Sequence, residues 1–167
     1  MIVDTVGRLA SFVAAHDGPK LWVRALYEPG QFTSGDLHSP LAQLCADPLG
    51  ADCEWNPRLV PPADALVITK TTVDAGSCPA FVQATEAMVG DVDVLLVTGF
   101  SLTTCVAATA TSCAERLGGR LPVVVPLSLT AARAGLYVPN DGHPAEVNAA
   151  LARLRAAGVV VCDSPGT

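Results

Sequence analysis

The chain has 167 residues, 50% of them hydrophobic, which is enough for one domain with a hydrophobic core and too few for two full domains. Its formal net charge of -6, with no basic cluster, disfavours nucleic acid and anionic membrane surfaces as partners. The chain opens without a basic segment and apolar core, and no apolar run approaches the roughly 20 residues that span a bilayer, so we expect a single cytoplasmic domain over residues 1–167.

The cysteines predict neither a metal site nor a disulfide framework. Their spacing is irregular and contains no Cys-x-x-Cys pair, which argues against a zinc knuckle or a thioredoxin-type motif. In a reducing compartment most of them are expected to be small buried hydrophobes. We therefore expect no metal and no cofactor. The six are Cys45, Cys53, Cys78, Cys105, Cys113 and Cys162.

The first part of the chain predicts a helix, a strand and a long loop. Apolar residues recur at helical spacing over residues 2–16, and Asp17-Gly18-Pro19 ends that helix. Residues 21–26 read as a strand. Residues 27–64 are rich in Gly, Pro, Asp and Ser, and loops of that length usually cover or build a functional site.

From residue 65 onward, strands alternate with helices. Such alternation produces parallel, right-handed units, so the predicted fold is a doubly wound α/β protein, a three-layer α/β/α sandwich with a Rossmann-like, mostly parallel sheet. The site of such a fold lies beyond the carboxyl ends of the strands. The predicted strands are residues 65–69, 92–98, 121–125 and 159–162, and the predicted helices are residues 79–89, a helix from Cys105 to Gly118-Gly119, and residues 144–157.

Two residues carry the predicted chemistry. The apolar run at residues 94–97 breaks at Gly99 and restarts as a helix on Cys105, which places a thiol at a helix N-terminus. Unpaired N–H groups and the helix dipole favour a thiolate there and can hold a developing oxyanion. Lys70 closes a buried strand at the edge where sites form. The alternatives are a buried small residue for Cys105 and an exposed strand-end lysine for Lys70.

These residues carry a family resemblance. Lys70 follows a buried strand, and the pattern Gly99-x5-Cys105-Val106 is followed by Thr109-Ala110. This arrangement resembles the isochorismatase-like cysteine hydrolases, which include nicotinamidases, N-carbamoylsarcosine amidases and isochorismatases. The amidases of this family use an Asp, a Lys and a Cys, and the Cys is acylated with loss of ammonia or an amine. The resemblance assigns Lys70 and Cys105 to two of those three positions.

The resemblance also implies the surroundings of the nucleophile. The backbone N–H groups of Thr104 and Cys105 would form the oxyanion hole, and the Phe100-Ser101 peptide would be cis. Phe100 and Ser101 are candidates to line the pocket, as is Asp74 in the unusual segment that follows Lys70.

The departures from the family concern its Asp and its metal site. The family's Asp ends a first strand that lies at the centre of its sheet. Here a helix opens the chain, and Asp4 lies inside that helix. We therefore expect the family's first strand to be lacking. The chain is therefore expected to be N-terminally short relative to the family. The Asp-x-His metal motif of nicotinamidases is not found in residues 27–32, which disfavours a metal-dependent nicotinamidase.

The resemblance implies a cysteine-dependent hydrolase of a small amide or carbamoyl-type substrate, acting through a thioester and forming a homo-oligomer. The alternative is a catalytically impaired or non-catalytic domain that serves ligand binding or oligomer assembly, because a base that accepts the thiol proton is not identified. Isochorismate hydrolysis is a lesser alternative, since that reaction depends on the Asp and needs no cysteine.

Overall fold

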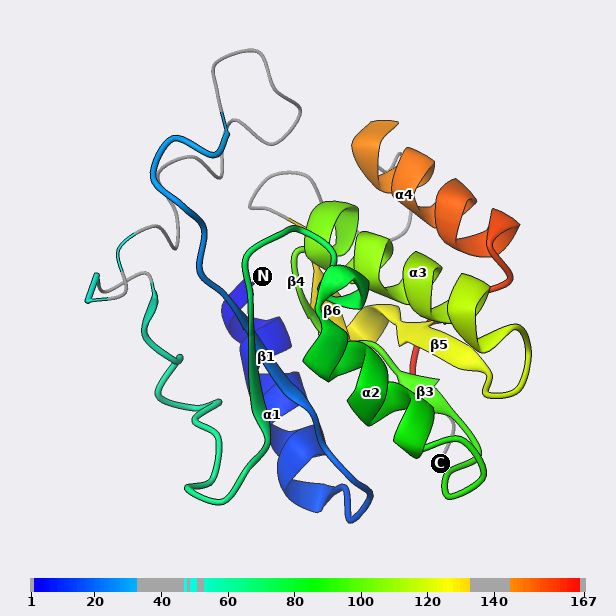
Figure 1. The fold of residues 1–167 in the computed structure, drawn as a ribbon, viewed down its shortest axis with the longest axis horizontal. Coiled ribbons are helices and arrows are strands. Elements are labelled where there is room, and N and C mark those ends of the chain that lie inside the picture. Colours follow the sequence, from blue (N-terminus) through cyan, green and yellow to red (C-terminus); the bar gives the residue numbers. More distant parts are fainter. Residues whose placement is uncertain (1, 33–46, 48, 51–52, 133–144, 166–167) are drawn as a thin grey trace.

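The computed structural model describes residues 2–32, 47, 49–50, 53–132 and 145–165. Much of the predicted loop at residues 27–64 and the predicted helix start at residue 144 lie outside the described residues. Every strand pairing among the described strands is parallel. Helices α2 and α3 lie in front of the strands and α1 lies behind β1 (Figure 1). The predicted three-layer α/β/α fold is confirmed.

The elements follow one another largely as the sequence predicts. The helices are α1 (Ile2–Ala15), α2 (Pro79–Ala87), α3 (Ala107–Leu117) and α4 (Ala145–Ala156). The strands are β1 (Trp22–Ala25), β2 (Val67–Lys70), β3 (Leu95–Leu96), β4 (Gly99–Phe100), β5 (Val123–Pro126), β6 (Thr130–Ala131) and β7 (Val160–Cys162). Short helical turns add η3 (Ala75–Ser77), η4 (Leu102–Val106) and η5 (Leu127–Leu129).

Local sequence explains where the helices begin and end. Pro79 occupies the first turn of α2, where its missing N–H costs nothing. Gly118 follows α3 with φ of 55°, the left-handed conformation that ends helices and favours glycine. The Asp74 side chain accepts a hydrogen bond from the Gly76 N–H and so caps η3.

The core lies between α3, α4 and the larger sheet. Leu102, Leu117, Val125 and Leu154 are almost completely buried there. Strand β2 reaches this core through Ile68. Helix α4 packs on α3, and β7 pairs with β5. The turn that carries Cys105 is part of this core through Leu102 and Val106.

The strands form separate sheets rather than one. Strand β1 pairs with β2, β3 pairs with β5 and β5 with β7, and β4 pairs with β6. The Trp22 N–H donates to Leu66 O at 3.0 Å, across the edge of β1 that faces β2. Successive residues of a strand direct their amides to opposite edges. The backbone amide of Val23 therefore faces the opposite edge of β1. Among the described residues no strand pairs with that edge, and no strand precedes α1.

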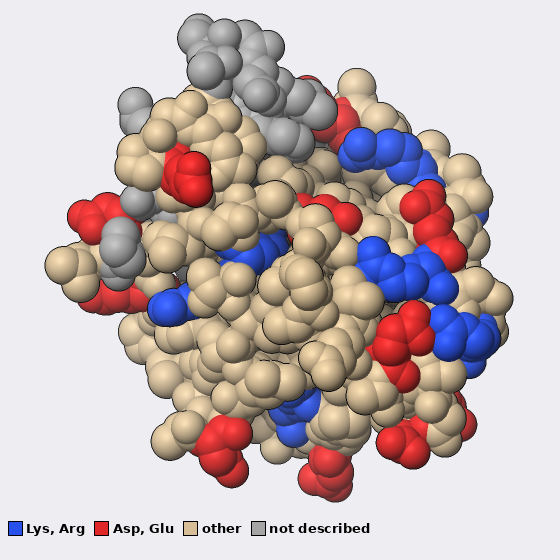
Figure 2. Space-filling view, viewed as in Figure 1, with Lys and Arg blue, Asp and Glu red and all other residues tan. Residues whose placement is uncertain are grey.

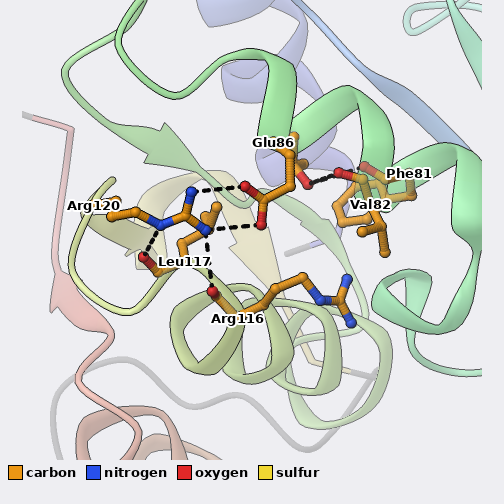
Figure 3. Close-up of polar contacts among 7 residues, drawn as sticks. Phe81, Val82, Glu86, Arg116, Leu117 and Arg120 are labelled. Atoms are coloured by element: carbon orange, nitrogen blue, oxygen red, sulfur yellow. Dashed lines mark hydrogen bonds and ion pairs between the residues drawn. The ribbon is translucent and has the colours of Figure 1, made fainter.

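A surface ion pair ties α2 to the end of α3. Arg120 Nη1 lies 2.9 Å from Glu86 Oε2, and Arg120 Nη2 donates to Glu86 Oε1 at 2.9 Å (Figure 3). The Arg120 Nε also donates to Leu117 O at 3.2 Å. Hydrogen bonding to Arg120 lowers the pKa of Glu86, so this bidentate pair is ionised at neutral pH.

The described residues form no continuous basic area on the face shown in Figure 2. Figure 2 shows acidic and basic side chains interspersed over the described residues of that face. Within the described ranges, no helix combines the length and the apolar character needed to cross a bilayer.

Candidate active site

Lys70 is a buried cation held by the loop that follows its strand. Its side chain is only 5% exposed. The ammonium donates to Thr72 O at 2.7 Å and to Val73 O at 2.6 Å. These bonds use two of its three donors and fix the charge at the carboxyl end of β2. The structure thus places Lys70 at the sheet edge where the sequence predicts the site.

Tyr27 connects this cation to Cys105. The Tyr27 Oη lies 3.6 Å from Cys105 Sγ, and either atom can donate the hydrogen bond. The Lys70 Nζ lies 5.7 Å from the centroid of the Tyr27 ring, within cation–π range. Tyr27 is 4% exposed, and its ring packs edge-on against Phe32 with centroids 4.9 Å apart. The buried phenol therefore contacts both a buried ammonium and the half-buried thiol.

Cys105 lies in the π-helical first turn of the helical segment, near the helix start that the sequence predicts but in a wider turn than that of an α-helix. The helical segment begins at Leu102, and α3 begins only at Ala107. The Val106 N–H donates to Ser101 O at 3.1 Å, a bond that spans five residues instead of four. This wider turn holds Cys105 between β4 and α3, and such turns occur frequently at functional sites.

Hydrogen bonds join the two loops that carry Tyr27 and Lys70 to each other and to α3. Gln31 Nε2 donates to Thr71 O at 2.8 Å and joins the loop after β1 to the loop after β2. The Ala75 N–H donates to Thr109 Oγ1 at 3.0 Å and joins the loop after β2 to α3. Thr109 belongs to the motif read from the sequence, whereas Gln31 was not singled out.

Asp74 forms its hydrogen bonds with the loop after β2 and with α3, and none with the Cys105 thiol. Its Oδ1 accepts from Ser112 Oγ at 2.9 Å and from the Gly76 N–H at 2.7 Å. It also lines a groove of about 490 Å³ between α3 and α4, together with Ser112 and Arg153. Tyr27, Lys70 and Cys105 are not among the residues that line this groove.

The peptide between Phe100 and Ser101 is cis, as the resemblance implies. Phe100 is 39% exposed, and Ser101 is half-buried with its Oγ 3.4 Å from Thr103 Oγ1. The Thr104 N–H, assigned to the oxyanion hole by the resemblance, donates to Ser101 O at 3.2 Å. An oxyanion would share this donor with that carbonyl.

The described residues place no carboxylate in hydrogen-bond contact with Cys105 or Lys70. The early candidate, Asp4, is exposed and lines a surface hollow with Arg8 and Arg58 instead. In the described part of the chain, no group of three or more His, Cys, Asp or Glu side chains is arranged to hold a metal ion. Within the described ranges, the side-chain groups at hydrogen-bond distance from the thiol are the Tyr27 hydroxyl at 3.6 Å and the Thr104 hydroxyl at 3.9 Å.

Sequence comparison identifies one family. A family model described as "Isochorismatase domain" matches residues 1–165. Comparison with curated protein sequences finds no match.

Solved structures share the fold at low sequence identity. An N-carbamoylsarcosine amidase from Thermoplasma acidophilum is 19% identical, with a TM-score of 0.69 over 99% of this chain and 86% of that chain. A cysteine hydrolase from Pseudomonas syringae pv. phaseolicola is also 19% identical, with a TM-score of 0.65 over 97% and 76%. The octameric ycaC gene product of Escherichia coli, a hydrolase of unknown specificity, is 16% identical, with a TM-score of 0.60 over 96% and 63%.

Proposed function

The chain belongs to the isochorismatase family, and from this premise we propose that it hydrolyses a small amide or carbamoyl-type substrate with Cys105 as nucleophile. The sulfur attacks the substrate carbonyl, the amine leaves, and water releases the acid from the thioester. The observation that carries the proposal is the contact of Cys105 with Tyr27 at 3.6 Å, beside the buried ammonium of Lys70. The amidase and the cysteine hydrolase among the structural relatives support this reaction class.

Lys70 supplies the positive charge of the proposed site. A cation in a buried position stabilises a neighbouring anion more strongly than one in water does, because less solvent screens it. Its bonds to Thr72 O and Val73 O hold that charge in place without neutralising it. Lys70 is therefore assigned to stabilise the thiolate before the attack and the oxyanion that forms afterwards.

The oxyanion is assigned to the backbone of the π turn. The N–H groups of Thr104 and Cys105 lie in the first turn of the helical segment, where donors converge and the helix dipole favours negative charge. Asp74, Phe100 and Ser101 remain candidates for the wider pocket.

The proposal is tested by the rate at which iodoacetamide alkylates each cysteine between pH 5 and 9, measured by peptide mass spectrometry. Cys105 and Cys162 are both half-buried, so Cys162 is the matched control. We expect Cys105 to react at least about tenfold faster at pH 7, and Lys70→Met to remove most of that advantage. Equal rates for the two cysteines in the folded protein would refute a nucleophilic role.

A non-catalytic binding or assembly domain is the second candidate. It is favoured by the finding that no described carboxylate contacts Cys105 or Lys70. A chain of this kind would bind a small amide without turning it over and would show no selective alkylation at Cys105. The same experiment therefore separates the two candidates.

We also propose that the chain forms a homo-oligomer, as the octameric Escherichia coli relative does. Light scattering after size exclusion is expected to give a multiple of the 17.1 kDa chain mass. A monomer mass would overturn this assignment.

A further inference from the structure

We propose that Tyr27 is the proton carrier of this site and takes the place of a catalytic carboxylate. The inference rests on the proposed function of Cys105 as nucleophile. Its starting point is the contact of Tyr27 Oη with Cys105 Sγ at 3.6 Å. Among the described residues, the other side-chain group that contacts this sulfur is the Thr104 hydroxyl at 3.9 Å, an alcohol and therefore a much weaker acid than a phenol.

The position of Tyr27 is fixed by packing. The side chain is 4% exposed, and Phe32, itself 8% exposed, packs edge-on against the ring. Tyr27 follows β1 by two residues and therefore lies at the carboxyl edge of the sheet, where Lys70 ends β2. A buried phenol held in this way loses little conformational freedom when it meets a reacting group.

A buried positive charge lies beside the Tyr27 ring. The Lys70 ammonium lies 5.7 Å from the ring centroid and is itself buried. A phenolate formed next to this cation would be stabilised by it, as a developing anion is in a preorganised site. Of the acidic residues that the sequence singles out, Asp4 lines a surface hollow, and Asp74 accepts a hydrogen bond from Ser112 Oγ.

The proposed proton path conserves atoms and charge. The Cys105 thiolate attacks the carbonyl carbon, and the C–N bond breaks as the amine nitrogen takes the phenol proton, which leaves a thioester and the Tyr27 phenolate. The phenolate then takes a proton from water as the water oxygen bonds to the thioester carbonyl. The C–S bond breaks, and the acid, the thiolate and the Tyr27 phenol are formed.

The first test compares the pH dependence of Cys105 alkylation in wild type and Tyr27→Phe, with iodoacetamide as the probe. Loss of the hydroxyl is expected to raise the half-maximal pH of alkylation by about one to two pH units, because a hydrogen bond to the anionic sulfur is lost. The alkylation midpoint of the half-buried Cys162, measured in the same two proteins, is the control and is expected to be unchanged by Tyr27→Phe. If Cys105 of the wild type reacts selectively and Tyr27→Phe has the same midpoint, this inference fails and the proposed function stands.

The second test uses p-nitrophenyl acetate, whose leaving group needs no proton. At a pH above its own alkylation midpoint, Tyr27→Phe is expected to keep the amplitude of the initial burst of nitrophenolate, because acylation requires only the thiolate. The steady-state rate is expected to fall by about 10²- to 10⁴-fold, because deacylation requires the base. An unchanged steady-state rate would overturn the role of Tyr27. Absence of a burst in the wild type would overturn the proposed function and, with it, this inference.

Discussion

Replacing Lys70 with methionine should destabilise the fold because two carbonyls lose their donor. Methionine keeps the unbranched stem and removes the ammonium that donates to Thr72 O at 2.7 Å and Val73 O at 2.6 Å. A hydrogen bond that involves a charged group contributes about 1.5 to 3 kcal/mol net. Part of the loss is offset because an ammonium with 5% exposure no longer has to be desolvated. We therefore expect a loss of about 2 to 4 kcal/mol, rather than the full sum.

The measurement is urea unfolding followed by tryptophan fluorescence, with thermal unfolding as a second readout. For a domain of this size the expected loss lowers Tm by about 4 to 15 °C. Lys20→Met is the matched control, because the Lys20 ammonium also donates to a carbonyl, that of His16, but at the surface. The control is expected to change the free energy of unfolding by no more than about 0.5 kcal/mol.

The reasoning would be refuted by a Lys70→Met protein that unfolds at the same urea concentration as Lys20→Met. That result would mean that the Thr72 and Val73 carbonyls do not restrain the ammonium in solution. The charge would then be free to move, and the fixed position that the proposed mechanism requires would be lost.

Three further outcomes follow from the described contacts. Gly76→Ala is expected to cost about 1 to 3 kcal/mol, because an added Cβ would lie 1.9 Å from Ser112 Oγ; urea unfolding checks it. Because the pKa of Glu86 is lowered in the folded state, its ionised form stabilises the fold at pH values above the unfolded-state pKa of about 4.3. The difference in Tm between wild type and Glu86→Gln should therefore vanish as pH falls below about 4. Added salt should also reduce this difference, because it screens the charge of Arg120. Burial, and next the charge of a nearby carboxylate, raise the pKa of Cys113 to about 12. The free energy of unfolding should therefore fall by up to about 1.4 kcal/mol per pH unit above about pH 9, and Cys113→Ala should remove that slope in urea titrations at pH 8 and 10.

The order and type of the main elements could be predicted because each depends on a local signal. The apolar spacing of α1, Pro79 at the start of α2 and Gly118 after α3 each act within a few residues. The small strand β4 and its partner β6 were not predicted, since two-residue strands carry no periodicity. The π turn was missed for a related reason: one extra residue changes the hydrogen-bond partner while the apolar pattern remains that of a helix.

A site residue could be predicted from the sequence only where a charged or nucleophilic side chain stands at the end of a predicted strand. Lys70 met that condition, and the structure places it at the expected edge. Tyr27 ends up beside Cys105, 78 positions later in the chain, and such long-range contacts leave no local signature. The useful signal was its position just after the strand at residues 21–26, since carboxyl ends of parallel strands meet at one edge. A polar residue at that position is therefore a site candidate of the same kind as Lys70.

Because the strands form separate sheets, we expect the site to open locally without unfolding of the whole domain. Tyr27 follows β1, and Lys70 ends its partner strand β2. Cys105 instead precedes α3, which packs on β5. Within the described ranges no strand pairing joins these two units, so they can part by giving up side-chain packing and loop hydrogen bonds such as that of Ala75 to Thr109. Opening of this kind requires less free energy than global unfolding. The fraction of molecules able to react would then equal the fraction in which the β1–β2 pair is packed against the rest of the domain. The backbone amides of β1 and β2 would exchange with solvent before those of β5.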